Sequence, residues 1–278
     1  MLKAGHTCKL TVSRLSEFGV YLTDGEGGEV LLPNRYTSLA DKEGDEKEVF
    51  LYHDSEDRLV ATTEKPLLQA GEAGFLEVVD KTVHGAFLDW GLHGKDLFLP
   101  NRNQQGQPVV GRRCVVYLYE DAVTGRCVAT CKLKSFINND VITLRPRQQV
   151  QLLVASESPV GYRVIIDNRH WGVLYRNQLF RPVGVGDRLT GYVRRITEDN
   201  RIDVSLQQEG FAQVQVSADR LLELLRESNG TLALNDDSSP AEVARRTGMS
   251  KKVFKRALGM LLKSGRVTVD PNGIKLCE

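Results

Sequence analysis

Arginine and aromatic side chains gather in the third quarter of the chain, in a pattern typical of nucleic-acid binding. An arginine guanidinium binds phosphate through parallel hydrogen bonds and also stacks on a base, and an aromatic ring offers a base a flat surface. The alternative is a solvated basic face whose tryptophan lies in the core. We favour the first interpretation, and its candidate RNA-binding residues are Arg163, Arg169, His170, Trp171, Tyr175, Arg176 and Arg201.

A second candidate surface follows from the alternation of residues 84–91. Successive side chains of a strand point to opposite faces, so Ala86 and Leu88 share one face and Phe87 lies on the other. If the aliphatic face is the core, Phe87 stands in solvent, where it can stack on an unpaired base. The alternative is that Phe87 and Trp90 only cover one end of the fold. The candidate binding residues here are His84, Phe87 and Trp90, with Phe18 and Tyr21 at the matching positions of an earlier segment.

A third concentration of charge lies near the C-terminus. Residues 245–266 hold eight Lys or Arg side chains and no acidic one, which suits a phosphate backbone. The alternative is a solvated face on a protein-docking module. The candidate nucleic-acid-binding residues of this segment are Arg245, Arg246, Lys251, Lys252, Lys255, Arg256, Lys263 and Arg266.

An internal repeat organises the chain ahead of this basic segment. Gly19, Gly85 and Gly161 each begin a short alternating apolar run, and a second glycine follows 25, 26 and 25 positions later. Landmarks that hold their spacing three times indicate three copies of one structural unit. Each copy contains five short strand-like segments between turn residues, which predicts a small closed β-barrel. We place the copies at residues 1–66 (unit one), 67–138 (unit two) and 139–213 (unit three).

Residues 214–278 change from strand-like to helical patterns. We predict helices over 219–227, 240–247 and 250–263, the last two capped by Ser239 and Ser250. Two strands, 266–269 and 274–276, flank a turn at 270–273. Three helices and a two-stranded wing indicate a winged helix-turn-helix, so the fold class is mainly β with a C-terminal α+β domain. The expected buried stripe of the last helix is Phe254, Ala257, Leu258, Leu261 and Leu262.

Composition limits the kind of protein and its partners. A hydrophobic content of 41% and a charged content of 26% are ordinary for a soluble protein, and no apolar run reaches the ~20 residues of a membrane span. The net charge of +1 hides a gradient from −5 in unit one to +3 in residues 217–278, so a polyanion should prefer the C-terminal half. Five cysteines without paired spacing, and no apolar leader with a cleavage site, indicate a cytoplasmic protein.

Motifs of catalysis and metal binding are absent from the sequence. It contains no glycine-rich phosphate loop, no nucleophile elbow and no pair of histidines at metal-ligand spacing. Cys127 and Cys131 are better interpreted as small core residues than as metal ligands. We therefore expect no catalytic residue, no metal and no cofactor, and a protein that is not an enzyme.

Two segments resemble a known domain. Residues 85–91 (Gly-Ala-Phe-Leu-Asp-Trp-Gly) and the hairpin 186–206 resemble the S1 RNA-binding domain, a branch of the oligonucleotide-binding (OB) fold. The order of three such units and a winged helix, with the segment 249–255, resembles the conserved virulence factor B (CvfB) family along the whole chain. The resemblance implies RNA binding and regulation of gene expression. Its RNA contacts, carried over by position, are Phe18, Tyr21, His84, Phe87, Arg163, Tyr175 and Arg201.

Three hypotheses about partners remain open at this point. The leading one is a protein that binds single-stranded RNA across its tandem units. The second is a transcription regulator that binds duplex DNA through the winged helix. The third is a scaffold that docks on a ribosome, a polymerase or a nuclease. Loss of residues 214–278 should leave RNA binding intact under the first hypothesis and abolish duplex DNA binding under the second.

Overall fold

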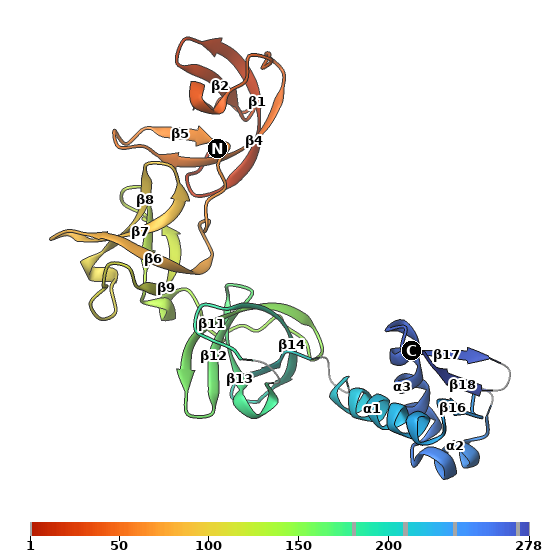
Figure 1. Ribbon diagram of the computed structural model, residues 1–278. Helices are drawn as coiled ribbons and strands as arrows, with labels where there is room; N and C mark the ends of the chain where they lie inside the picture. The colour runs from red at the N-terminus through yellow and green to blue at the C-terminus, as the bar shows by residue number, and fades with distance from the viewer. Residues whose placement is uncertain (1, 180–181, 208–210, 236–237, 271–272, 278) are drawn as a thin grey trace.

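The computed structural model describes residues 2–179, 182–207, 211–235, 238–270 and 273–277. Three small β-units follow one another from the N-terminus, and a helical unit with a short sheet ends the chain (Figure 1). This is the fold class expected from the sequence: OB-like barrels followed by a winged helix.

Units one and three are closed five-stranded barrels of the same topology. Their strand orders are β1-β2-β3-β5-β4 and β11-β12-β13-β15-β14. In both, a parallel pairing of the third and fifth strands closes the sheet, through Leu31 and Val60 in unit one and through Gly172 and Ile202 in unit three. The strands are β1 (Thr7–Ser16), β2 (Gly19–Thr23), β3 (Glu29–Pro33), β4 (Glu46–His53), β5 (Leu59–Thr62), β11 (Gln149–Ser158), β12 (Gly161–Ile166), β13 (His170–Tyr175), β14 (Arg188–Ile196) and β15 (Ile202–Ser205).

Unit two departs from the expected closed barrel. Its strands are β6 (Ala73–Lys81), β7 (Gly85–Leu92), β8 (Lys95–Pro100), β9 (Arg113–Glu120) and β10 (Cys127–Thr130). They form a sheet in the order β10-β9-β6-β7-β8, and within residues 67–138, all of which are described, no ladder joins β8 to β10. Asn103, which follows β8, spans the gap instead. Its side-chain amide donates to the Ala129 carbonyl at 3.0 Å, and its backbone carbonyl accepts from the Cys131 amide at 2.9 Å.

The repeated glycine has a steric cause. Gly19 and Gly161 begin the second strands of their barrels with φ angles of +146° and +153°, which side chains rarely adopt. A Cβ at these positions would collide with the carbonyl oxygens of Leu32 and Leu174 on the neighbouring strand. The close approach of the two strands therefore requires glycine, which explains why the sequence repeats a glycine at this position of each unit.

Replacing Gly161 by alanine should lower the free energy of unfolding by about 1–3 kcal/mol, because the added methyl group forces the two strands apart. Gly184→Ala is the matched control within unit three, since no atom lies within 4 Å of its Cβ position and its φ is not in the positive range. Urea unfolding followed by circular dichroism measures both variants. Equal stability of the two would contradict the steric argument.

Apolar clusters join the β-units to one another. Phe50, Tyr52 and Val60 of unit one belong to the same buried cluster as Leu68 and Trp90 of unit two. A further cluster, formed by Ala73, Ile137, Leu153 and Ile165, joins units two and three. Shared buried side chains restrict relative motion of packed domains more than a polar linker does, so neighbouring units present their surfaces in a fixed relation.

The C-terminal unit is a winged helix with two differences from the sequence-based expectation. Helix α1 begins at Phe211, eight residues earlier than predicted, and a short strand β16 adds a third strand to the wing sheet. Residues 213–216 (Gln-Val-Gln-Val) alternate in a strand-like way, but they are helical, and Ala218 on the same helix is fully buried. The elements are α1 (Phe211–Glu227), β16 (Thr231–Leu232), α2 (Pro240–Thr247), α3 (Lys251–Lys263), β17 (Val267–Asp270) and β18 (Gly273–Leu276).

The predicted caps of this unit are confirmed. The hydroxyls of Ser239 and Ser250 accept from the amides of Glu242 and Val253, and Gly248 ends α2 in the left-handed conformation. The predicted buried stripe of α3 holds except at Leu262, which is 43% exposed and was wrongly assigned to the core. Part of the predicted turn, residues 271–272, lies outside the described residues.

Candidate nucleic-acid interface

A groove with a volume of about 650 Å³ lies on the outer face of unit three. Arg163 of β12, Trp171 of β13 and Arg201, which follows the β14–β15 turn, all line it. The structure thus brings together three of the seven residues that the sequence predicts for this unit. Tyr162 and Val160 lie in the wall next to them.

Strand alternation explains why these side chains face outward. Along β13, His170, Gly172 and Leu174 are buried and the residues between them are only partly buried. Arg163 is likewise the partly buried residue between Tyr162 and Val164, which are core residues on β12. Arg163 pairs with Val173 in the β12–β13 ladder, so the outward row of β13 lies directly beside it.

The guanidinium of Arg163 lies over the indole of Trp171. The Cζ atom is 3.7 Å from the ring centroid, within the range of a cation–π contact. We expected Trp171 to be an open stacking surface, and the structure corrects this, because Arg163 covers it. A guanidinium can itself stack on a base.

Arg163 has no acidic partner among the described residues. Partial burial alone lowers the pKa of Arg163, and no carboxylate counteracts this effect. A half-buried cation without a counter-ion gains stabilisation from an approaching anion. The neighbouring indole Nε1 is buried and also lacks a hydrogen-bond partner among the residues described.

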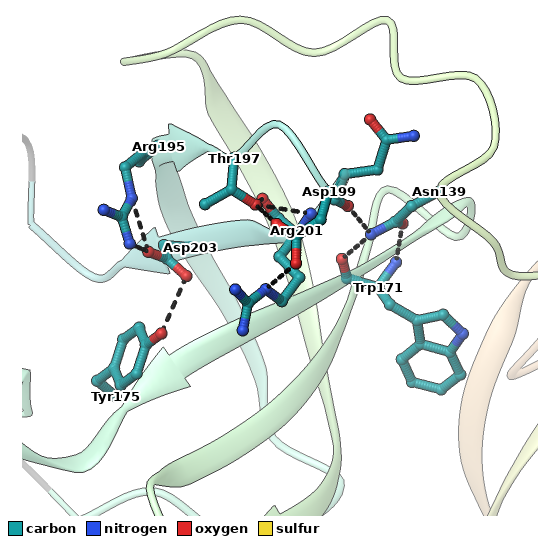
Figure 2. A network of polar contacts seen from close by, with 9 residues as sticks. Asn139, Trp171, Tyr175, Arg195, Thr197, Asp199, Arg201 and Asp203 are labelled. Atoms are coloured by element: carbon teal, nitrogen blue, oxygen red, sulfur yellow. Dashed lines mark hydrogen bonds and ion pairs between the residues drawn. The ribbon is translucent and has the colours of Figure 1, made fainter.

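A polar network fixes the strand and the turn on either side of this pair. Figure 2 shows Asn139 between Trp171 and the β14–β15 turn. The Asn139 side chain donates to the carbonyls of Trp171 at 2.9 Å and Asn200 at 2.8 Å, and its oxygen accepts from the Trp171 amide at 2.8 Å. This network therefore holds Trp171 and the β14–β15 turn in a fixed relation to each other.

Arg201 is held by an acidic neighbour, in contrast to Arg163. Its guanidinium lies 2.7 Å from a carboxylate oxygen of Asp199 (Figure 2). The Thr197 hydroxyl and then Arg201 lower the pKa of Asp199, so this carboxylate stays charged at neutral pH. Arg201 can reach a phosphate only by sharing or leaving this exposed ion pair, and such pairs are weak.

The other predicted residues of unit three lie outside the groove lining. Tyr175 is half-buried, and its hydroxyl donates to Asp203 at 3.2 Å, while Arg195 holds the same carboxylate at 2.8 Å (Figure 2). Arg176 is exposed, with its guanidinium 3.5 Å from Glu157. Arg169 is exposed as well.

His170 was wrongly placed at the surface. It is only 6% exposed, and its Nδ1 lies 2.9 Å from the Asn138 carbonyl. The β13 alternation puts His170 on the face opposite to Trp171, so its imidazole lies on the buried face of the strand.

Unit one repeats the arginine–aromatic stack with a different electrostatic setting. The Arg14 Cζ atom lies 3.5 Å from the ring centroid of Tyr21. Tyr21 occupies the position in unit one that Arg163 occupies in unit three. Two hydrogen bonds of 3.2 and 2.7 Å tie Arg14 to Glu29, which neutralises its charge. Phe18 is 65% exposed at the tip of the same unit. The sequence analysis missed Arg14, although its pairing with Tyr21 follows from a β1–β2 hairpin register.

In unit two, one of the predicted binding residues is buried. Trp90 is 2% exposed, its indole donates to the Leu68 carbonyl at 2.8 Å, and it meets Phe50 edge-on. Its neighbour Phe87 is half-buried, with its ring 5.2 Å from that of Phe98. His84 is exposed. Phe98, which the sequence analysis missed, could have been found from its place between Leu97 and Leu99 on an alternating strand.

The predicted basic residues of the winged helix lie on α2 and α3, except Arg266, which precedes β17. All eight are exposed except Lys251, which is half-buried. Arg246 forms a 3.6 Å ion pair with Glu242 one turn earlier on α2. The opposite faces of α2 and α3 contribute to a buried core that includes Phe254 and Leu258.

Comparisons with known proteins agree with this architecture. A family model described as a CvfB-like winged helix domain matches residues 219–276, and one described as an S1 domain matches residues 4–64 and 70–132. The chain is 31% identical to the uncharacterized protein YitL of Bacillus subtilis, over 96% of this chain and 91% of the relative. It is 21% identical to conserved virulence factor B of Staphylococcus saprophyticus, over 94% and 91% of the two chains.

A solved multidomain protein of Streptococcus pneumoniae, described as having nucleic acid binding domains, is 21% identical with a TM-score of 0.41. The match covers 99% of this chain and 98% of that one. In the described part of the chain, no helix is long and apolar enough to cross a membrane. The same residues contain no group of three or more His, Cys, Asp or Glu side chains placed to hold a metal ion.

Proposed function

The chain belongs to the conserved virulence factor B family, and from this premise we propose that it binds single-stranded RNA without catalysing a reaction and regulates gene expression after transcription. The S1 domains support a nucleic-acid-binding role. The observation that supports the finer proposal is the Arg163–Trp171 stack in the groove, a half-buried guanidinium for which the described residues provide no acidic partner.

This stack favours an unpaired strand over a duplex. A base lies flat on a guanidinium only when its own face is free, and duplex bases are stacked on one another. Arg201 lines the same groove, and the exposed Arg176 has its guanidinium 5.4 Å from the ring of Tyr162 in the groove wall, so both are candidates for contacts with flanking phosphates. Linkage of unit three to other weak sites would raise the affinity for a long strand through effective concentration.

Binding to an unstructured RNA should weaken steeply with salt. If Arg163, Arg176 and Arg201 each neutralise one phosphate, the slope of log K against log salt concentration should be about −2, because each contact contributes about −0.7 on single strands. Fluorescence anisotropy at several salt concentrations measures this slope. An affinity independent of salt would contradict phosphate contacts.

The winged helix supports a second candidate function, which is binding of duplex DNA. The supporting observation is the basic surface of α2 and α3, with no acid between residues 245 and 266. Reversal of two exposed charges, Lys252→Glu with Arg256→Glu, should abolish duplex DNA binding under this candidate and leave the affinity for single-stranded RNA within about threefold. Electrophoretic mobility shifts with duplex DNA and with single-stranded RNA separate the two candidate functions.

A partner that co-purifies after RNase treatment would instead favour docking on a ribosome, polymerase or nuclease.

A further inference from the structure

Two cysteines of unit two lie together at one end of its β-sheet. Cys114 is the second residue of β9, and Cys131 directly follows the last residue of β10. The two strands are antiparallel, with Thr130 opposite Tyr117, so the start of β9 and the end of β10 meet at the same end of the sheet. Both cysteines are free thiols and are partly exposed.

Strand alternation directs the two side chains to the same face. Cys114 comes two residues before the buried Val116, and it packs against the same apolar cluster. On β10, Ala129 of this cluster is paired with Leu118. Two residues further along, Cys131 comes opposite Val116 and also packs against the cluster, so Cys114 is its diagonal neighbour. The Cys114 thiol accordingly lies within hydrogen-bonding reach of the Cys131 sulfur.

This contact makes the two sulfur atoms chemically different. The hydrogen bond from Cys114 lowers the pKa of Cys131 against the effect of burial, and the backbone amide of Gln105 acts in the same direction. The same contact, and then burial, raise the pKa of Cys114. Because the thiolate is the reactive form of cysteine, Cys131 is the nucleophile of the pair and Cys114 supplies the second thiol.

Cys127 does not share this arrangement, although it also lies on β10. A strand rises about 3.3 Å per residue, so Cys127 is about 13 Å from Cys131 along the chain, which is too far for a disulfide. Burial raises the pKa of Cys127 to about 12, and it therefore stays a protonated thiol at neutral pH. Its sulfur also lies against Gly5 of unit one, which leaves no room for a methyl group at that glycine.

We propose that Cys114 and Cys131 form a reversible thiol-oxidation site that reacts with a hydroperoxide. First, the Cys131 thiolate attacks a peroxide oxygen and the O–O bond breaks. The sulfur is oxidised to a sulfenic acid, and the peroxide is reduced to an alcohol or water, which takes the proton that Cys131 released. Second, the Cys114 sulfur attacks the Cys131 sulfur and the S–O bond breaks. The departing hydroxide takes the Cys114 proton and leaves as water, so two thiols and one hydroperoxide give one disulfide.

The disulfide would join β9 to the segment that follows β10. It would lie on the side of unit two where, within residues 67–138, no ladder joins β8 to β10. There the Cys131 amide already donates to the carbonyl of Asn103 at 2.9 Å. The inference does not depend on the proposed function, because neither cysteine lines the groove of unit three.

Oxidation of the reduced full chain by hydrogen peroxide at neutral pH tests the proposal. Remaining thiols are alkylated, and mass spectrometry of non-reduced tryptic peptides identifies the oxidised sulfurs. Cys127 and Cys131 fall in one tryptic peptide, so fragmentation of that peptide locates the link. The wild type is compared with Cys114→Ser, Cys131→Ser and the matched control Cys277→Ser, which removes a partly exposed cysteine of the winged helix. Thermal unfolding verifies that each variant is folded.

The wild type and Cys277→Ser should form one disulfide between Cys114 and Cys131, and dithiothreitol should restore both thiols. Cys114→Ser should stop at a sulfenic acid on Cys131, which dimedone captures. Cys131→Ser should be oxidised at least about tenfold more slowly than the wild type, because it lacks the reactive thiolate.

Three results would overturn the inference. They are a disulfide through Cys127, a bond that forms only between two copies of the chain, and a wild type in which Cys131 is oxidised no faster than Cys277. All three are measured on the wild type, so they decide the question even where a serine variant fails to fold.

Discussion

Arg163→Ala is expected to weaken binding of unstructured RNA by about tenfold or more. A base stacked on a flat side-chain surface contributes about 1–3 kcal/mol, and the substitution also removes a groove cation that no carboxylate of the described residues neutralises. Fluorescence anisotropy with a labelled oligonucleotide at low salt measures the loss. Arg163→Lys should recover only part of the affinity, because an ammonium keeps the charge but has no plane for the base.

Arg14→Ala is the matched control for this substitution. Arg14 has the same relation to an aromatic ring, 3.5 Å over Tyr21, but Glu29 already binds its guanidinium. Its removal should change the affinity by less than about twofold, since a paired surface charge contributes little. Equal losses in Arg14→Ala and Arg163→Ala would show that the absence of an acidic partner does not select the binding unit.

Trp90→Ala is expected to reduce the free energy of unfolding by about 3–5 kcal/mol. The substitution opens a cavity in the cluster shared by units one and two, removes the edge-on contact with Phe50 and leaves the Leu68 carbonyl without its donor. Urea unfolding monitored by circular dichroism measures this change. Val83→Ala, which alters a side chain that is 84% exposed in the same unit, should stay within about 0.5 kcal/mol of the wild type. A small effect at Trp90 would mean that the two units do not share a core.

The β-units were predictable from the sequence because their signals are local. Alternation, turn residues and the glycines at 19, 85 and 161 repeat three times, and the structure places a strand at each expected segment. The steric need at Gly161 arises from a strand about a dozen residues away, well within one repeat. The caps Ser239 and Ser250 are local signals of the same kind.

The candidate site was predictable only in part because it depends on contacts between distant segments. Trp90 was a candidate binding residue, and it is buried in a cluster that it shares with Phe50 of another unit. The stack of Arg163 on Trp171 depends on the register between two strands and on the Asn139 network, neither of which alternation reveals. The ion pair between Arg195 on β14 and Asp203 on β15 was not predicted either, because it also depends on the register between two strands.

Photocrosslinking with mass spectrometry gives the most direct test of where RNA binds. The full chain is irradiated with an unstructured RNA, and the crosslinked peptides are identified. If the groove of unit three holds the strand, the crosslinks should map to β12 and β13, around Arg163 and Trp171, and should disappear in Arg163→Ala. Crosslinks confined to residues 245–266, with none in unit three, would contradict the account.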